Sequence, residues 1–316
     1  MRAGGMPPRS EESMLFGPDV GMKLRRSGYL YLIFALPFIY YLVFHYAPMY
    51  GILIAFQKYN IVKGIGGSKW VGFLHFGRFL SDPYFWKLVR NTLLLNIYNL
   101  AISFPAPIVL ALLLNEVRSN GVKRFVQSVS YLPHFISTVV VCGMVVNFLA
   151  SDGPIYGLIA GFGGKPSNFL LDPRWFRTIY VVSDVWQTIG WNSIVYFAAL
   201  CTIDQELYEA ALMDGAGRFS LVRHITLPGI MPTISIMLIL ALGKLMTIGF
   251  EKIILLYNGS TYETADVIST YVYRRGLLGA DFSYATAVGL FQSVIGLVLL
   301  ATANKAAKAV GETGLW

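Results

Sequence analysis

Seven polar or aromatic side chains stand out because they interrupt segments that are otherwise apolar. Groups of these types hydrogen-bond, carry charge or stack on rings, and here they are Asp184, Trp186, Gln187, Asn192, Tyr196, Lys244 and Gln292. A charge at mid-membrane depth costs at least ~2.5 kcal/mol, so Lys244 should face a partner or water. Polar groups also hold helices together, at about 0.6 kcal/mol per contact, and an interfacial Trp can simply anchor a helix end. The set therefore indicates a polar pathway or contacts between helices, with further candidates at Asn91, Asn96, Asn99 and Asn147.

The same survey finds no residues arranged for catalysis. The histidines are isolated from one another and have no carboxylate at ligand spacing, which argues against a metal site at His45, His75, His134 or His224. A phosphate-binding loop needs G-x-x-x-x-G-K-[ST], but Lys165 and Lys244 follow a glycine without the earlier glycine. We expect no enzyme activity, no ATP hydrolysis and no cofactor bound by this chain.

The elements that must position these residues are membrane spans. The chain has 316 residues, 55% of them hydrophobic and 13% charged, about half the charged share of a soluble domain. Its apolar blocks of roughly 20 residues or more match a hydrocarbon core ~30 Å thick at 1.5 Å per helical residue. Continuous runs of this length are typical of helices rather than of barrel strands. We predict an all-α polytopic membrane protein with six transmembrane helices, over residues 29–56, 88–114, 125–149, 179–200, 233–256 and 284–303.

These spans divide the chain into four parts. We expect a tail over 1–27, a first helix and a long outer loop over 28–87, a core of five helices over 88–304, and a second tail over 305–316. The net charge of +8 is spread over loops beside the spans, which favours lipid headgroups over nucleic acid as contacts. Lysines and arginines are almost evenly divided between the two sets of loops, so the positive-inside rule decides little.

A polar insert, EAALMDGAGRFSLVRHITLP, lies between the fourth and fifth spans. Residues 203–214 are predicted to form a short helix, with Thr202 or Asp204 as its cap and Gly215 as its left-handed stop. Its small residues leave a shallow face that another protein can approach closely, formed by Leu207, Ala210, Ala211 and Asp214. A plain polar connector would need neither the small residues nor the stopping glycine, so we favour docking.

The spacing of this insert resembles a known family. Glu209-Ala210-Ala211, Gly215 and Ile225-Thr226-Leu227-Pro228 are similar to the EAA loop in permease subunits of binding-protein-dependent ABC importers. "YLPHFIST" and "YETADVISTYVYRRGL" resemble the branch that imports oligosaccharides or polysaccharide fragments. Gln205 stands where that family often has proline, and Val222 stands where it often has an aromatic residue.

The resemblance implies a type I ABC importer (MetI-like) fold with a cytoplasmic coupling helix seated on an ATP-hydrolysing subunit. The docking residues would be Glu209, Ala210, Ala211, Asp214, Gly215 and Arg218. A cytoplasmic loop at this point puts both termini inside, in a bacterial cytoplasmic (inner) membrane. The implied partners are a second homologous permease subunit, two cytoplasmic ATPase subunits that carry ATP and Mg, and an extracytoplasmic solute-binding protein.

The implied substrate is a carbohydrate. A sugar pathway needs hydrogen-bonding groups and aromatic faces, which the seven side chains offer. Lys244 would suit an acidic, uronate-containing glycan such as alginate. The alternative is an ion-coupled secondary transporter or channel, which needs carboxylates within the membrane, and the candidates are Asp184 and, near a span end, Glu251.

Overall fold

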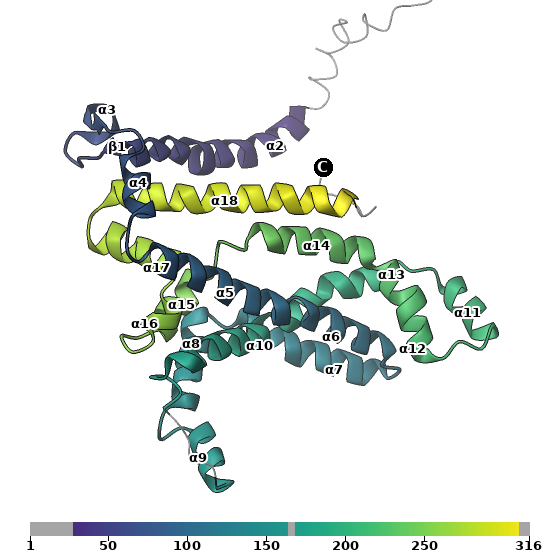
Figure 1. Ribbon diagram of the computed structural model, residues 1–316. Helices are drawn as coiled ribbons and strands as arrows, with labels where there is room; N and C mark the ends of the chain where they lie inside the picture. The colour runs from purple at the N-terminus through teal and green to yellow at the C-terminus, as the bar shows by residue number, and fades with distance from the viewer. Residues whose placement is uncertain (1–27, 164–167, 310–316) are drawn as a thin grey trace, which may run out of the picture. The chain divides into compact units, whose positions relative to one another are not determined.

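The computed structural model describes residues 28–163 and 168–309, which are mainly helical (Figure 1). They form two compact units that divide between Leu53 and Ile54. The predicted tail over 1–27, and residues 310–316 of the other predicted tail, lie outside the described residues. The first unit is one apolar rod, made of α2 (Gly28–Tyr41), the π turn η2 (Leu42–Tyr46) and most of the 3-10 helix η3 (Ala47–Phe56). None of the side chains of α2 or η2 is buried, as expected of an apolar span that faces lipid.

The second unit begins with a small hairpin. Strands β1 (Gln57–Lys58) and β2 (Lys69–Trp70) pair antiparallel, with Gln57 opposite Trp70, and α3 (Gly64–Gly67) lies between them in the chain. Helix α4 (Leu74–Leu80) follows. The sequence analysis missed the strand pair, because two residues are too few to leave an alternating pattern.

Some of the long helical segments of the core are interrupted and others are continuous. Proline at a helix start separates α6 (Pro105–Glu116) from α5 (Phe85–Ser103), and η4 (Leu132–Phe135) separates α7 (Asn120–Tyr131) from α8 (Thr138–Leu149). Helices α10 (Pro173–Leu200) and α18 (Phe282–Ala309) are continuous over 28 residues each. The remaining long segment is interrupted between α14 (Met231–Gly243) and α15 (Phe250–Leu256).

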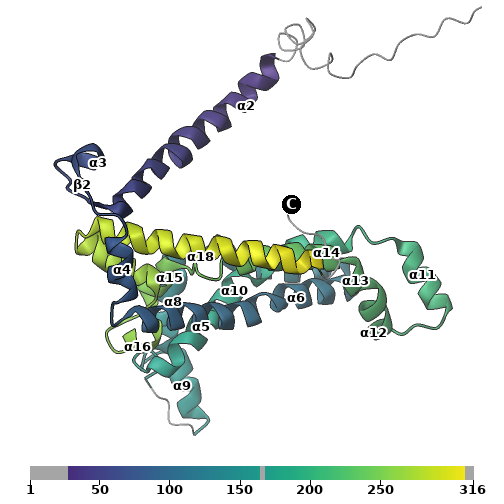
Figure 2. The same cartoon turned by 45° about the horizontal axis from the view of Figure 1, so that its top comes forward.

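Shorter helices lie between these segments. They are α9 (Pro154–Gly161) after α8, the insert helices α11 (Gln205–Met213), α12 (Arg218–Leu221), η5 (Val222–Thr226) and α13 (Leu227–Gly229), and the three before α18, which are α16 (Tyr262–Ala265), α17 (Ile268–Val272) and η6 (Tyr273–Leu278). Helix α10 packs on α5 and α6, and α14 packs on α18 (Figures 1 and 2).

Several stretches of the described chain are long and apolar enough to cross a membrane. Four qualify singly, namely Gly28–Phe56, Phe85–Glu116, Thr138–Gly161 and Phe282–Ala309. A fifth results if Arg218–Gly229 and Met231–Gly243, which meet at a bend of 60°, count as one. The predicted fourth span falls within α10, whose polar residues lower its mean hydropathy. A polytopic helical protein is therefore confirmed, and the number six stays a prediction.

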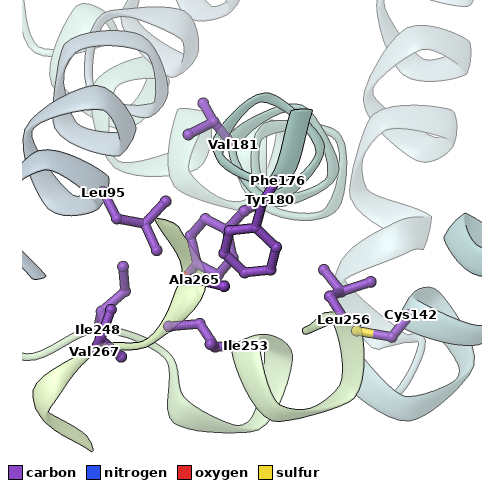
Figure 3. Close-up of a cluster of buried hydrophobic side chains, with 10 residues drawn as sticks. All are labelled: Leu95, Cys142, Phe176, Tyr180, Val181, Ile248, Ile253, Leu256, Ala265 and Val267. Atoms are coloured by element: carbon purple, nitrogen blue, oxygen red, sulfur yellow. The ribbon is translucent and has the colours of Figure 1, made fainter. Parts of the chain in front are cut away.

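The centre of the second unit is an apolar cluster between α5, α8, α10 and α15 (Figure 3). Leu95 and Ile253 are fully buried in it, and Tyr180 and Phe176 of α10 are 3% exposed. The cluster also includes Cys142, Val181, Ile248, Leu256, Ala265 and Val267. It holds α15 against α10 and so fixes the start of α15 beside the polar part of α10.

One glycine allows the backbones of α10 and α7 to meet. A Cβ on Gly190 would lie 2.1 Å from the carbonyl oxygen of Ser130 and 2.3 Å from its carbonyl carbon. Such an approach between membrane helices requires a small residue. We expect Gly190→Ala to destabilise the folded protein by about 1–3 kcal/mol, since the helices must separate. The measurement is the thermal unfolding midpoint in detergent.

The control for this prediction is Gly143→Ala in α8, where an added Cβ meets nothing within 4 Å. Alanine there removes the helix penalty of glycine, about 1 kcal/mol, so this variant should be neutral or slightly stabilised. Equal unfolding midpoints for the two variants would contradict the role assigned to Gly190.

Candidate functional site

Two polar cavities meet along α10. The first, of about 690 Å³, is bounded by residues 134–138, by the start of α15 and by the α10 side chains of Tyr180, Asp184, Gln187 and Thr188. The second, of about 400 Å³, is bounded by α5, α6 and α14 and by the α10 side chains of Asp184, Thr188, Asn192 and Tyr196. Asp184 and Thr188 line both cavities. These two side chains therefore lie between the two cavities.

Asp184 is paired with a cation that the sequence analysis did not single out. Lys252 Nζ lies 2.9 Å from Asp184 Oδ1, and Asn99 Nδ2 donates to Asp184 Oδ2 at 3.2 Å. The side chain of Lys252 is 6% exposed and that of Asp184 is 22% exposed. The sequence gives one indication of this pair, because a carboxylate inside a membrane span requires a partner of opposite charge. Lys252 was overlooked because it stands close to the end of the predicted fifth span.

Lys244, which was predicted to face a partner or water, lies beside the second cavity. It forms the C-terminal cap of α14, is exposed, and lines the second cavity together with Asn192 and Tyr196. No ion pair joins Lys244 to any residue within 28–163 or 168–309. A cation therefore faces open space beside the Asp184–Lys252 pair.

Gln187 is also in this region. Its Nε2 donates to the carbonyl oxygen of Ile136 at 3.2 Å, and its side chain lines the first cavity. Five of the seven predicted side chains thus line one or both polar cavities, and they are Asp184, Gln187, Asn192, Tyr196 and Lys244.

Trp186 and Gln292 line neither of these two cavities, and a place for them in a substrate pathway stays a prediction. Trp186 lines a separate apolar cavity of about 500 Å³ between α8, α9 and α10. It is two residues from Asp184, and residues two apart in a helix do not share a face. Gln292 of α18 donates from Nε2 to the carbonyl oxygen of Met246, in the break after α14. Its amide satisfies backbone that the interrupted helix leaves unpaired.

The insert contains the predicted helix as α11. Asp204 accepts a hydrogen bond from the backbone of Glu206 at 3.0 Å, which makes it the N-cap. Gly215 has φ +79°, and the Ala216 N–H donates to the Ala211 carbonyl at 2.9 Å. The predicted cap and left-handed stop are confirmed, and the helix is shorter than the predicted 203–214 by two residues at its start and one at its end.

Side-chain contacts hold the two ends of the insert together. The Tyr208 hydroxyl of α11 donates to Thr226 Oγ1 at 3.1 Å, and Thr226 is 2% exposed. Ile203 reaches Gly229 so closely that a Cβ there would lie 2.8 Å from its Cδ1 atom. These contacts join both ends of the insert, so α11 is held to the start of α14 rather than hanging on a free loop.

The rest of the insert is open. Glu209, Ala210, Asp214, Gly215 and Arg218 are exposed and Ala211 is half-buried. Large apolar side chains stand among them. Leu207 of the predicted docking face is 54% exposed, and three residues that the sequence analysis did not weigh are also exposed, Leu212 at 58%, Met213 at 88% and Phe219 at 77%. Exposed apolar side chains gathered on one segment are typical of a protein-binding surface.

Comparisons with known proteins identify the family of this chain. Residues 103–309 match the family described as "Binding-protein-dependent transport system inner membrane component". The polygalacturonan/rhamnogalacturonan transport system permease protein YteP of Bacillus subtilis (strain 168) is 48% identical over 296 residues, 93% of this chain and 92% of that protein. Protein LplB of the same organism is 46% identical over 294 residues, 93% of this chain and 92% of that protein.

A solved structure matches along nearly the whole chain. It is that of a bacterial alginate ABC transporter in complex with an alginate pentasaccharide-bound periplasmic protein. One chain of it is 43% identical to this chain and superposes with a TM-score of 0.85, over 93% of this chain and 99% of that one.

Proposed function

Because this chain belongs to the family of binding-protein-dependent transport system inner membrane components, we propose that it carries acidic oligosaccharides along α10. The chain is a permease of an ABC importer for sugars or polysaccharides, with the MetI-like fold of type I importers, and is a transport component rather than an enzyme. The acidity of the substrate and its path through this chain are the proposed part.

The observation that carries the proposal is the Asp184–Lys252 pair, in which Asp184 lines both polar cavities and Lys252 lines the first. An incoming sugar carboxylate can replace Asp184 as the partner of Lys252, and Lys244 offers a second cation in the next cavity. Such exchange keeps a charge partner on Lys252 throughout, while Asn99 still donates to the displaced Asp184 carboxylate. Relatives named for polygalacturonan and alginate, both acidic, support the same substrate class.

The insert is proposed to be the cytoplasmic coupling helix. Two ATPase subunits, which hold ATP and Mg, would each bind one permease. On this chain the contact would be formed by Glu209 to Gly215, including the exposed Met213, and by Arg218. A second homologous permease subunit would complete the bundle, and a solute-binding protein would deliver the sugar from outside. This arrangement has six spans and both termini inside. Its support is the exposed, braced insert and the similarity to a binding-protein-dependent transporter.

The ion-coupled alternative loses its main support in the structure. It rested on Asp184 as a carboxylate free to bind and release an ion, but that carboxylate is held by Lys252 and Asn99. Family membership points to ATP-driven import instead.

Reconstitution tests the proposed function. The chain would be purified with its second permease and ATPases, placed in liposomes, and supplied with the binding protein. We expect ATP-dependent uptake of oligogalacturonate or alginate oligosaccharide, and at least about tenfold slower uptake of a neutral oligosaccharide of equal length, which corresponds to about 1.4 kcal/mol. Uptake driven by an ion gradient without ATP, or equal uptake of the neutral sugar, would contradict it.

A further inference from the structure

A fourth cavity, of about 380 Å³, lies between the start of α5 and the short helices that precede α18. Volumes of roughly 300–1,000 Å³ are typical of small-molecule sites. Three cations line this cavity, Lys87, Arg274 and Arg275, against one lining carboxylate, Asp266. The cavity is separate from the two cavities along α10, and in the proposed orientation it is on the extracytoplasmic side.

One of these cations is already occupied. Arg274 donates to both carboxylate oxygens of Asp266, at 2.8 and 2.7 Å, and Thr270 Oγ1 donates to the same carboxylate at 2.8 Å. Asp266 is 5% exposed, so this is a buried bidentate pair. The Arg274 guanidinium also lies 5.1 Å from the ring centre of Tyr262. The pair therefore positions one aromatic wall of the cavity.

The other two cations are available. Neither Lys87 nor Arg275 makes an ion pair with any residue that the structure describes. Lys87 Nζ lies 6.0 Å from the ring centre of Tyr84, and the Arg275 guanidinium lies 5.6 Å from that of Tyr271. The Arg275 side chain also hydrogen-bonds to Tyr271, which leaves its other N–H groups and the ammonium of Lys87 for a ligand.

Asp82 contacts Tyr271, which lines the cavity, and offsets part of the positive charge of the lining residues. Its Oδ2 accepts from Tyr271 at 2.6 Å and from Tyr284 at 3.1 Å. Burial opposes ionisation of Asp82, but these hydrogen bonds, a backbone bond from Tyr84 and the charge of Arg275 together lower its pKa. The carboxylate is thus ionised at neutral pH, and the cavity still carries more positive than negative charge.

We propose that this cavity is an entry site for one uronate residue of the incoming glycan. Lys87 and Arg275 bind the sugar carboxylate, and the rings of Tyr84 and Tyr262 cover the apolar face of the sugar. The guanidinium supplies a planar pair of donors for a carboxylate, and the tyrosines supply stacking surface with little rotamer entropy to lose. The inference rests on the proposed function, because it assigns an acidic sugar to a second place on the same route.

The test uses the reconstituted full complex with its binding protein. Lys87→Gln and Arg275→Gln remove each charge and keep a polar side chain, and Lys63→Gln removes an exposed lysine outside the cavity. We expect each cavity variant to raise KM for uptake of an oligogalacturonate about tenfold, equivalent to about 1.4 kcal/mol, with little change in kcat. Lys63→Gln should leave KM unchanged.

Three results would overturn the inference while leaving the proposed function intact. One is an unchanged KM in both cavity variants of a complex that imports the uronate. The second is the same KM change for a neutral oligosaccharide. The third is weaker binding of the sugar-free binding protein, which would make the cavity a protein-docking surface. Failure of the unmutated complex to import any acidic oligosaccharide would instead overturn the proposed function.

Discussion

Lys252→Met is expected to lower the free energy of unfolding of the permease by about 3 kcal/mol or more. The substitution leaves the Asp184 carboxylate without its cation, with only Asn99 as a partner, in a site where Lys252 is 6% exposed. Breaking a buried pair on one side costs more than the pair itself contributes, because a charge is left uncompensated. The measurement is the unfolding midpoint of the purified complex in detergent, together with its yield in the membrane.

A double-mutant cycle separates the two roles of this pair. Asp184→Asn alone leaves the cation unpaired, whereas Asp184→Asn with Lys252→Met removes both charges and should recover much of the lost stability. Uptake of the acidic sugar should not recover, since the cation proposed to receive it is gone. Lys244→Met, which breaks no ion pair with a described residue, should change stability little. Additive losses in the cycle would show that the two side chains are energetically independent.

Gly215→Val is expected to reduce ATP-driven uptake by at least about tenfold, equivalent to about 1.4 kcal/mol. Gly215 holds φ +79°, where a β-branched residue is strained by roughly 1–3 kcal/mol. Relief of that strain would change the turn that ends α11, including the bond from Ala216 to Ala211. In the proposed complex, the face from Glu209 to Asp214 would then meet the ATPase subunit in a changed orientation.

Gly215→Asn is the matched variant for this prediction. An added Cβ meets nothing within 4 Å at this position, so both substitutions enter open space and differ in backbone preference. Asparagine tolerates the left-handed conformation and should keep most of the uptake. The readout is stimulation of ATPase activity by the sugar-loaded binding protein, at equal subunit stoichiometry. Equal activity of the valine and asparagine variants would contradict a role for this turn.

Local signals explain why the insert was predictable. A capping aspartate, a stopping glycine and small residues act within one or two turns of chain, and α11 has its cap and stop where the sequence places them. The long unbroken helices α10 and α18 were predictable for a similar reason, since apolar length alone indicates them. The break after α14 was not, because glycines and a lysine inside an apolar run do not show which backbone groups a neighbour will satisfy.

The features that the sequence did not predict depend on contacts between residues far apart in the chain. Asp184 and Lys252 are 68 residues apart in the chain, and the Tyr271–Asp82 hydrogen bond joins residues 189 apart. Composition identified Asp184 as unusual but could not choose its partner among several cations. The cavity at Lys87 and Arg275 depends on the same kind of pairing, so the sequence analysis placed these residues in separate parts of the chain and did not link them.

The interruption between α14 and α15 separates a helix that continues from the insert from a helix that packs on the core. Helix α14 continues from the insert through a 60° bend and stops at Gly243, whereas α15 packs on α8 and α10. A tilt of the insert would therefore move Lys244, at the end of α14, relative to Lys252, which α15 holds near α10. In the proposed importer, ATP turnover would then change the distance between these two ammonium groups and so the position of an anion bound between them.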